Sequence, residues 1–339
     1  MNRRILRKQS NSLNFIRILA ASQVMFGHLV EHLELPIKEN IFRASSFLRG
    51  VPIFFAISGF LIWFSIESSK SYSHYITKRF LRIYPELWAA VMIELLFLMI
   101  FYHGWDIKSL ILFGFGQGTI FQFWTPEALR GYGVGTPNGA LWTIGVMIQF
   151  YIMAWIFYKI MKNRKMITWM IGLIISFMVS CVFNSITHEF IRIEVIGKLY
   201  DQTLIRYFWI FYIGMFIAEF QEFLLPICRK YWWMSLLLSY TFFWSKIDIL
   251  SGYYLFWSLF LIIGVIGFAY RFPQLNVPLD ISYGLFLYHM TVVNVFVNFR
   301  WGGGKWEYAL LIVLITVILA YISTVTVGKL SVRKKRLLT

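Results

Sequence analysis

The sequence predicts an all-α membrane protein, a polytopic bundle of about ten transmembrane helices with both termini in the cytoplasm. Of the 339 residues, 59% are hydrophobic and only 14% are charged, whereas soluble domains carry about 25% charged residues. Apolar runs of about twenty residues, the length that crosses a bilayer as a helix, recur along the whole chain. Lys and Arg gather in alternate connections between these runs, which is typical of cytoplasmic loops.

The expected spans lie near residues 14–35, 44–66, 85–103, 139–161, 166–186, 203–222, 231–246, 252–270, 279–298 and 308–328. An eleventh apolar run, residues 110–124, is short and contains three glycines (Gly114, Gly116 and Gly118). Counting it as a crossing would place the basic cluster 159–165 outside, against the positive-inside rule. We therefore expect residues 104–138 to form an outer, glycine-rich segment that dips back into the protein and is a candidate cavity wall.

No internal repeat or soluble appendage is visible, so residues 1–339 are predicted to form one membrane domain. The net charge of +16 follows from the positive-inside rule, and we expect no nucleic-acid partner. Cys181 and Cys228 fall near opposite membrane faces in this topology, so no disulfide is expected between them.

Arg17 and His28 lie within the first expected span, eleven residues apart. That spacing returns to nearly the same helix face after about three turns. Ionisable groups at this depth rarely face lipid and imply a polar cavity or a partner. If His28 is catalytic, it acts as a general base on a substrate hydroxyl.

Arg79 and Arg82 are expected in the cytoplasmic connection after the second span and are spaced i,i+3. On a helix they would present two guanidinium groups to one side, which suits a phosphate-bearing ligand. A purely topological role beside anionic lipid headgroups explains the same pattern.

Residues 28–32 read H-x-x-E-H, which matches an inverted zinc-peptidase motif. The motif straddles the outer end of an apolar span and has no obvious third ligand, so we expect no metal. Glu94 is a carboxylate deep inside a predicted span. His289 is either a hydrogen-bonded core residue or part of a cavity. Trp142, close to Asn138, either packs or stacks on a sugar.

Several stretches, taken in order, resemble the acyltransferase-3 family of bacterial membrane acyltransferases, which includes O-antigen and exopolysaccharide O-acetylases. They are RILA at 17–20 with His28, GVPIFFAISGFLI at 50–62, RFLRIYP at 79–85, NGALWTI at 138–144, QFY at 149–151 and SYGLFLYH at 282–289. The resemblance covers the whole chain.

The resemblance implies acetyl-CoA as a co-substrate, no bound cofactor, and a sugar hydroxyl of a cell-surface polysaccharide or a lipid-linked precursor as acceptor. It implies His28 as the catalytic residue and Arg17, Arg79 and Arg82 as donor-binding residues. Asn138, Trp142, Glu94, Tyr283 and His289 are candidates for the acceptor site or the cavity. The expected location is the bacterial inner membrane.

One position departs from the family pattern, because Met147 stands where the family usually carries Glu. A methionine can neither accept a proton nor hold a histidine tautomer. Either another acid such as Glu94 compensates, or the role is dispensable, or activity is impaired. A non-catalytic transporter of polysaccharides or lipid-linked sugars is the alternative function.

Overall fold

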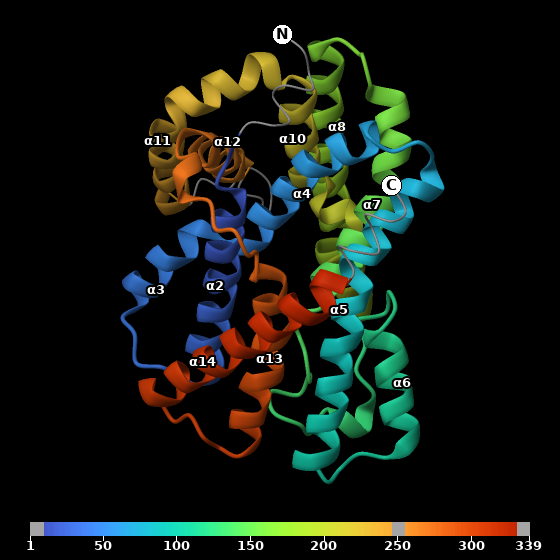
Figure 1. Cartoon of the computed structure of the whole chain (residues 1–339), viewed down its shortest axis with the longest axis vertical. Helices are drawn as coiled ribbons and strands as arrows, with labels where there is room; N and C mark the ends of the chain where they lie inside the picture. The colour runs from blue at the N-terminus through green and yellow to red at the C-terminus, as the bar shows by residue number, and fades with distance from the viewer. Residues whose placement is uncertain (1–9, 246–254, 331–339) are drawn as a thin grey trace. The chain divides into compact units, whose positions relative to one another are not determined.

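The computed structural model describes residues 10–245 and 255–330, whose regular secondary structure is all helical, joined by loops and with no β-strand. This confirms the all-α part of the predicted fold class. The helices are α2 (Leu13–His32), α3 (Glu39–Ser45), α4 (Gly50–Glu67), α5 (Tyr72–Phe101), α6 (Ile107–Gln117), α7 (Trp142–Met161), α8 (Met166–Asn184), α9 (Glu194–Tyr200), α10 (Leu204–Glu219), α11 (Gln221–Ser245), α12 (Leu255–Arg271), α13 (Ser282–Asn298) and α14 (Trp306–Ser323) (Figure 1).

Six helical segments in the described residues are long and apolar enough to cross a membrane, or up to seven if a bent pair is one span. Each of the ten predicted runs overlaps a helix. However, α12 and α13 have only 17 residues each, and the helical segment that ends at Glu219 meets α11 at a bend of 107°. The helices therefore support a multi-pass membrane protein, while ten crossings and cytoplasmic termini stay predictions.

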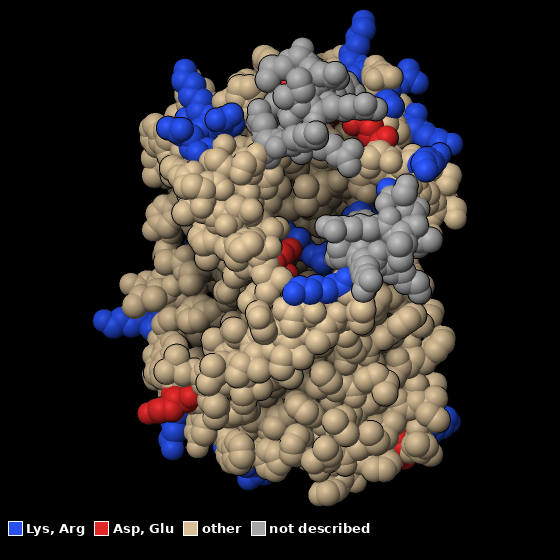
Figure 2. Space-filling view, viewed as in Figure 1, with Lys and Arg blue, Asp and Glu red and all other residues tan. Residues whose placement is uncertain are grey.

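Large apolar side chains cover much of the molecular surface. Met92 is 65% exposed and Leu310 is 69% exposed, and both lie on candidate spans. On the face in Figure 2, uncharged residues cover most of the area, and charged residues appear in a few separate groups. Exposed apolar side chains of this size on candidate spans fit contact with lipid.

The chain divides into two compact units that interleave along the sequence. The first unit comprises residues 1–17, 47–75 and 146–278, and the second comprises residues 18–46, 76–145 and 279–339. Helices α2, α5 and α7 each contribute residues to both units. The prediction of a single domain stays a prediction.

The first unit is built around α4 and α10, which approach each other closely. A Cβ atom at Gly59 would lie 2.0 Å from the Phe211 carbonyl oxygen, so only glycine permits this contact. The buried carboxylate of Glu219 accepts hydrogen bonds from Trp63 Nε1 at 3.0 Å and from the Asn163 backbone N–H at 3.1 Å. This acid therefore has a structural role in the first unit.

The second unit contains α13 and α14 side by side (Figure 1), together with most of α5 and all of α6. The buried face of α5 carries Leu87, Ala90, Glu94 and Leu98, at the three- and four-residue spacing of one helix face. Leu98 packs in a cluster with residues of α6 and of the loop that follows it. Glu94 is thus placed on the inner side of α5.

Helix α5 begins earlier than the sequence predicted. Arg79 and Arg82 were expected in a connection, but they lie inside the helix, and so does Pro85. The 30 residues correspond to about 45 Å of helix, which exceeds the hydrocarbon thickness of about 30 Å. The first turns of α5, with both arginines, can therefore extend beyond the apolar layer.

The segment predicted at 104–138 contains α6 and a short 3₁₀ turn, Glu127–Leu129. Asp106 caps α6, because its side chain accepts a hydrogen bond from Ser109 N at 2.9 Å. The hydrogen bonds from the Ser109 side chain and backbone lower the pKa of the Asp106 carboxyl. Whether this segment re-enters the membrane stays a prediction.

Candidate active site

His28 lies on α2 within the second unit and is half-buried. Its ring meets the His32 ring edge-on, with 5.5 Å between centroids, and the His289 ring with 5.1 Å between centroids. Its Nδ1 atom lies 2.7 Å from the sulfur of Met290. A thioether is only a weak acceptor, so a proton on Nδ1 has a weak partner there, and Nε2 is left as the proton-accepting atom.

His289 lies on α13 and is completely buried. Its Nδ1 atom is 3.1 Å from the carbonyl oxygen of Leu285, which assigns the proton to Nδ1 and the lone pair to Nε2. Within residues 10–245 and 255–330, Nε2 has no hydrogen-bond partner. Leaving a buried acceptor unmatched costs about 1–3 kcal/mol. The His28–His289 pair is therefore a candidate reaction centre.

Asn138 connects the segment before α7 to the helix that carries His289. Its amide nitrogen donates to the Leu287 carbonyl at 2.9 Å and to Thr291 Oγ1 at 3.2 Å. Leu287 and Thr291 are the positions two residues before and two after His289. Asn138 thereby holds this segment against α13 around His289.

Asn294, which the sequence analysis did not single out, anchors the same segment one turn further along α13. It is fully buried, accepts from the Val134 N–H at 2.8 Å and donates to the Pro137 carbonyl at 2.7 Å. A Cβ atom at Gly133, where φ is +55°, would lie 1.9 Å from Asn294 Oδ1. An amide inside an apolar run was the available sequence signal for this residue.

Glu94, Tyr132 and Asn138 form a second buried polar group in the same unit. The side chains of Asn138 and Tyr132 lie close enough to the Glu94 carboxyl to interact with it electrostatically. By geometry, however, both Glu94 oxygens, Tyr132 Oη and Asn138 Oδ1 lack hydrogen-bond partners among the described residues. These unmatched atoms are available to a ligand hydroxyl or to a shared proton.

Arg82 is engaged with the start of α13. Its guanidinium pairs with Asp280 at 3.4 Å and lies 5.9 Å from the centre of the Tyr283 ring. Asp280 also accepts from Ser282 N at 3.1 Å, and the Tyr283 hydroxyl donates to the Ile83 carbonyl at 3.0 Å. Arg82 and Tyr283 thus join α5 to α13, and Arg79 is half-buried one turn earlier on α5.

The remaining predicted site residues lie elsewhere. Arg17 is on α2 but belongs to the first unit, as does Met147, and both are half-buried. Trp142 begins α7 in the second unit and is half-buried. The structure therefore brings His28 together with His289, Asn138 with Glu94, and Arg82 with Tyr283.

The H-x-x-E-H motif at residues 28–32 forms no metal site within the described residues. Glu31 is exposed beside the half-buried His32, and the described part of the chain holds no group of three or more His, Cys, Asp or Glu residues placed to bind a metal. Cys181 and Cys228 are both free, in line with the absence of a disulfide between them that the sequence predicted, and both are buried.

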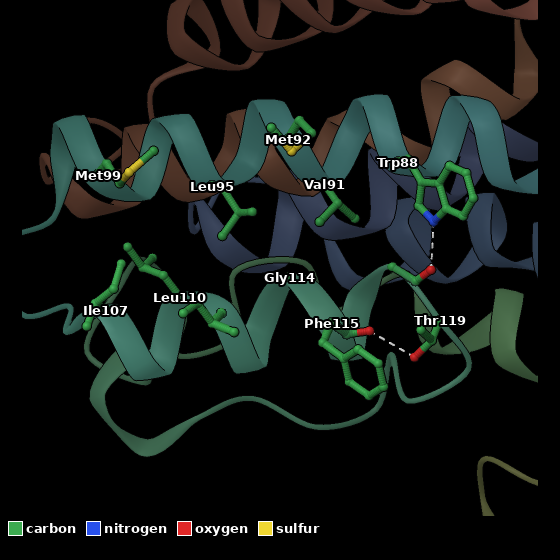
Figure 3. Close-up of a pocket in the computed structure, with 12 residues that line it drawn as sticks. Trp88, Val91, Met92, Leu95, Met99, Ile107, Leu110, Gly114, Phe115 and Thr119 are labelled. Carbon is green, nitrogen blue, oxygen red and sulfur yellow. Dashed lines mark hydrogen bonds between the residues drawn. The ribbon is translucent and has the colours of Figure 1, made fainter.

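A groove of about 540 Å³ lies between α5 and α6 (Figure 3). Its lining is apolar, with Met92, Leu95 and Ile107 among the contributors, and its polar contacts are confined to one end. There Trp88 Nε1 donates to the Gly118 carbonyl at 2.8 Å. The groove has no ionisable lining residue and is therefore not the candidate reaction centre.

Comparison with known proteins identifies the family. The family model described as "Acyltransferase domain" (Acyl_transf_3) matches residues 10–326. The chain belongs to the acyltransferase-3 family. This membership decides for an acyltransferase over the transporter alternative.

Two relatives align along most of this acyltransferase. One is "Nodulation protein 10" of Rhizobium leguminosarum bv. viciae, 26% identical over 336 residues, which cover 87% of this chain and 86% of the relative. Another is "O-acetyl transferase" of Shigella phage Sf6, 25% identical over 314 residues, which cover 86% of each chain. No solved structure gives a significant match.

Proposed function

We propose that this acyltransferase is an O-acetyltransferase of the bacterial inner membrane. The donor is acetyl-CoA, and the acceptor is a hydroxyl group of a cell-surface polysaccharide or of its lipid-linked precursor. The observation that carries the proposal is the half-buried imidazole of His28, which lies beside a second, fully buried imidazole. Family membership supports acyl transfer, and the name of the phage relative supports an acetyl group and an oxygen acceptor.

The proposed step needs one base. Nε2 of His28 removes the proton from the sugar hydroxyl while the hydroxyl oxygen attacks the thioester carbonyl. A C–O bond forms, and the carbonyl electrons move onto oxygen. When this intermediate collapses, the C–S bond breaks, and His28 returns its proton to the departing thiolate. The products are an acetyl ester of the sugar and free CoA.

The donor requires cationic contacts for its phosphates. Arg79 and Arg82 are spaced i,i+3 in the first turns of α5, and a guanidinium can hold a phosphate through two parallel hydrogen bonds. Because Arg82 already pairs with Asp280, we assign it to positioning the start of α13 as well as to the donor. Arg17 is the third donor-binding candidate.

Inverted membrane vesicles test this function. Vesicles that contain the protein receive acetyl-CoA labelled in the acetyl group, together with the polysaccharide or lipid-linked fraction of the same cells. We expect label in that fraction that alkali removes, as an ester requires, with release of free thiol in equal amount. Label no higher than in vesicles without the protein would refute the proposal.

A further inference from the structure

We propose that His289 is a positioning residue whose Nε2 accepts a hydrogen bond from Nδ1–H of His28 when His28 carries the substrate proton. This inference rests on the proposed function, because it concerns the charged form of His28 that acyl transfer creates. In hydrolases with a histidine base, a carboxylate usually stabilises that charge. Here a second imidazole takes that place.

The tautomer of His289 is fixed by α13. Its Nδ1–H donates to the Leu285 carbonyl at 3.1 Å, so the Nε2 lone pair has to find another donor. The side chain is fully buried, and Nε2 has no donor within residues 10–245 and 255–330. Among the described residues, the aromatic rings in contact with His289 are those of His28 and Phe286, and of these only His28 bears an N–H group.

The spacing of the two rings fits such a bond. Their centroids are 5.1 Å apart. Two imidazole rings joined by an N–H···N bond of about 2.9 Å, with about 1.1 Å from each nitrogen to its ring centre, would have centroids about 5 Å apart. The distance between the rings is therefore compatible with this bond once Nδ1 of His28 turns from Met290 toward His289.

In the neutral form of His28, Nδ1 has the sulfur of Met290 as its partner and not Nε2 of His289. The sulfur lies 2.7 Å from His28 Nδ1 and is a weak acceptor. A charged imidazolium donates more strongly than a neutral ring. The stronger acceptor, His289 Nε2, is then favoured over sulfur. No proton leaves His28 in this step, so His28 still returns its proton to the thiolate.

Two substitutions of His289 separate the nitrogen atoms. His289→Asn keeps a donor near the position of Nδ1 but removes the acceptor at Nε2, whereas His289→Gln can place its amide oxygen near Nε2. We expect kcat to fall about 10- to 100-fold in His289→Asn with KM for acetyl-CoA unchanged, and to stay within about fivefold in His289→Gln. Val292→Ala, a buried truncation on the same helix, controls for loosening of α13.

An equal fall of kcat in both His289 variants, or the same fall in Val292→Ala, would show that His289 acts through packing. A wild-type kcat in His289→Asn would also overturn the proposal.

A second measurement, NMR of the wild-type protein labelled with ¹⁵N at its six histidines, requires neither the donor nor the acceptor substrate. We expect a nitrogen–nitrogen coupling between His28 Nδ1 and His289 Nε2 once His28 is protonated. Its absence at every pH would reject the pair, whereas lack of acetyl transfer by the wild type would reject only the proposed function.

Discussion

The imidazole rings of His28 and His289 lie 5.1 Å apart between their centroids, although α2 and α13 stand near opposite ends of the sequence. Both histidines belong to the second unit. Asn138 and Asn294 hold the segment before α7 against α13 on either side of His289. The base proposed for acyl transfer therefore lies beside a helix whose position is fixed by buried amides.

Arg82 is expected to contribute to donor binding beyond its ion pair. Arg82→Lys replaces a planar, bidentate group by a point charge, and loss of a hydrogen bond to a charged group should raise KM for acetyl-CoA about 10- to 100-fold. Asp280→Asn is the matched control, because it removes the partner charge and keeps an acceptor for Ser282 N. Steady-state kinetics in vesicles would measure both variants. An identical rise of KM in Asp280→Asn would assign Arg82 to the ion pair alone.

Glu94 is expected to act as an uncharged donor. Both of its oxygens and Asn138 Oδ1 are buried acceptors without a donor among the described residues, and a protonated carboxyl could donate to the amide oxygen. Glu94→Gln supplies an N–H instead and should preserve folding stability. Glu94→Leu leaves Asn138 Oδ1 unmatched and should cost about 1–3 kcal/mol. Thermal unfolding in detergent compares them, and equal destabilisation by both substitutions would exclude this role.

Gly133 is expected to be required for the contact with Asn294. Gly133→Ala adds the cost of an L-residue at φ +55° and brings the Cβ atom within 1.9 Å of Asn294 Oδ1. Gly303→Ala is a matched control, because Gly303 has φ +51° and open space around its Cβ position. The control should lose about 1 kcal/mol, and Gly133→Ala should lose more. Equal melting temperatures for the two variants would contradict the contact.

The sequence predicted the helical fold because long apolar runs and basic clusters depend on local composition, which the bilayer constrains directly. It did not predict the start of α5 at Tyr72, because Arg79, Arg82 and Pro85 are typical of a connection although a helix contains all of them. It named His28 and His289 separately. Their contact joins distant segments, and helical periodicity within one segment cannot report such a contact.

The sequence also could not predict the role of Asn294. Its hydrogen bonds reach Val134 and Pro137, which lie in a loop without periodic structure. Only the three-dimensional arrangement shows that this amide satisfies backbone groups of that loop. The same limit applies to Arg17 and Met147. Their partners depend on how distant segments pack, and residue spacing within one segment does not identify them.

The most direct test of the account is the rate of acetyl transfer by His28→Ala in vesicles with labelled acetyl-CoA, at a protein level equal to that of the wild type. Loss of the general base should lower the rate about 100- to 10,000-fold. His32→Ala, which removes the neighbouring imidazole on the same helix, should keep the rate within about tenfold. A rate near the wild-type value in His28→Ala would contradict the central claim that His28 is the base.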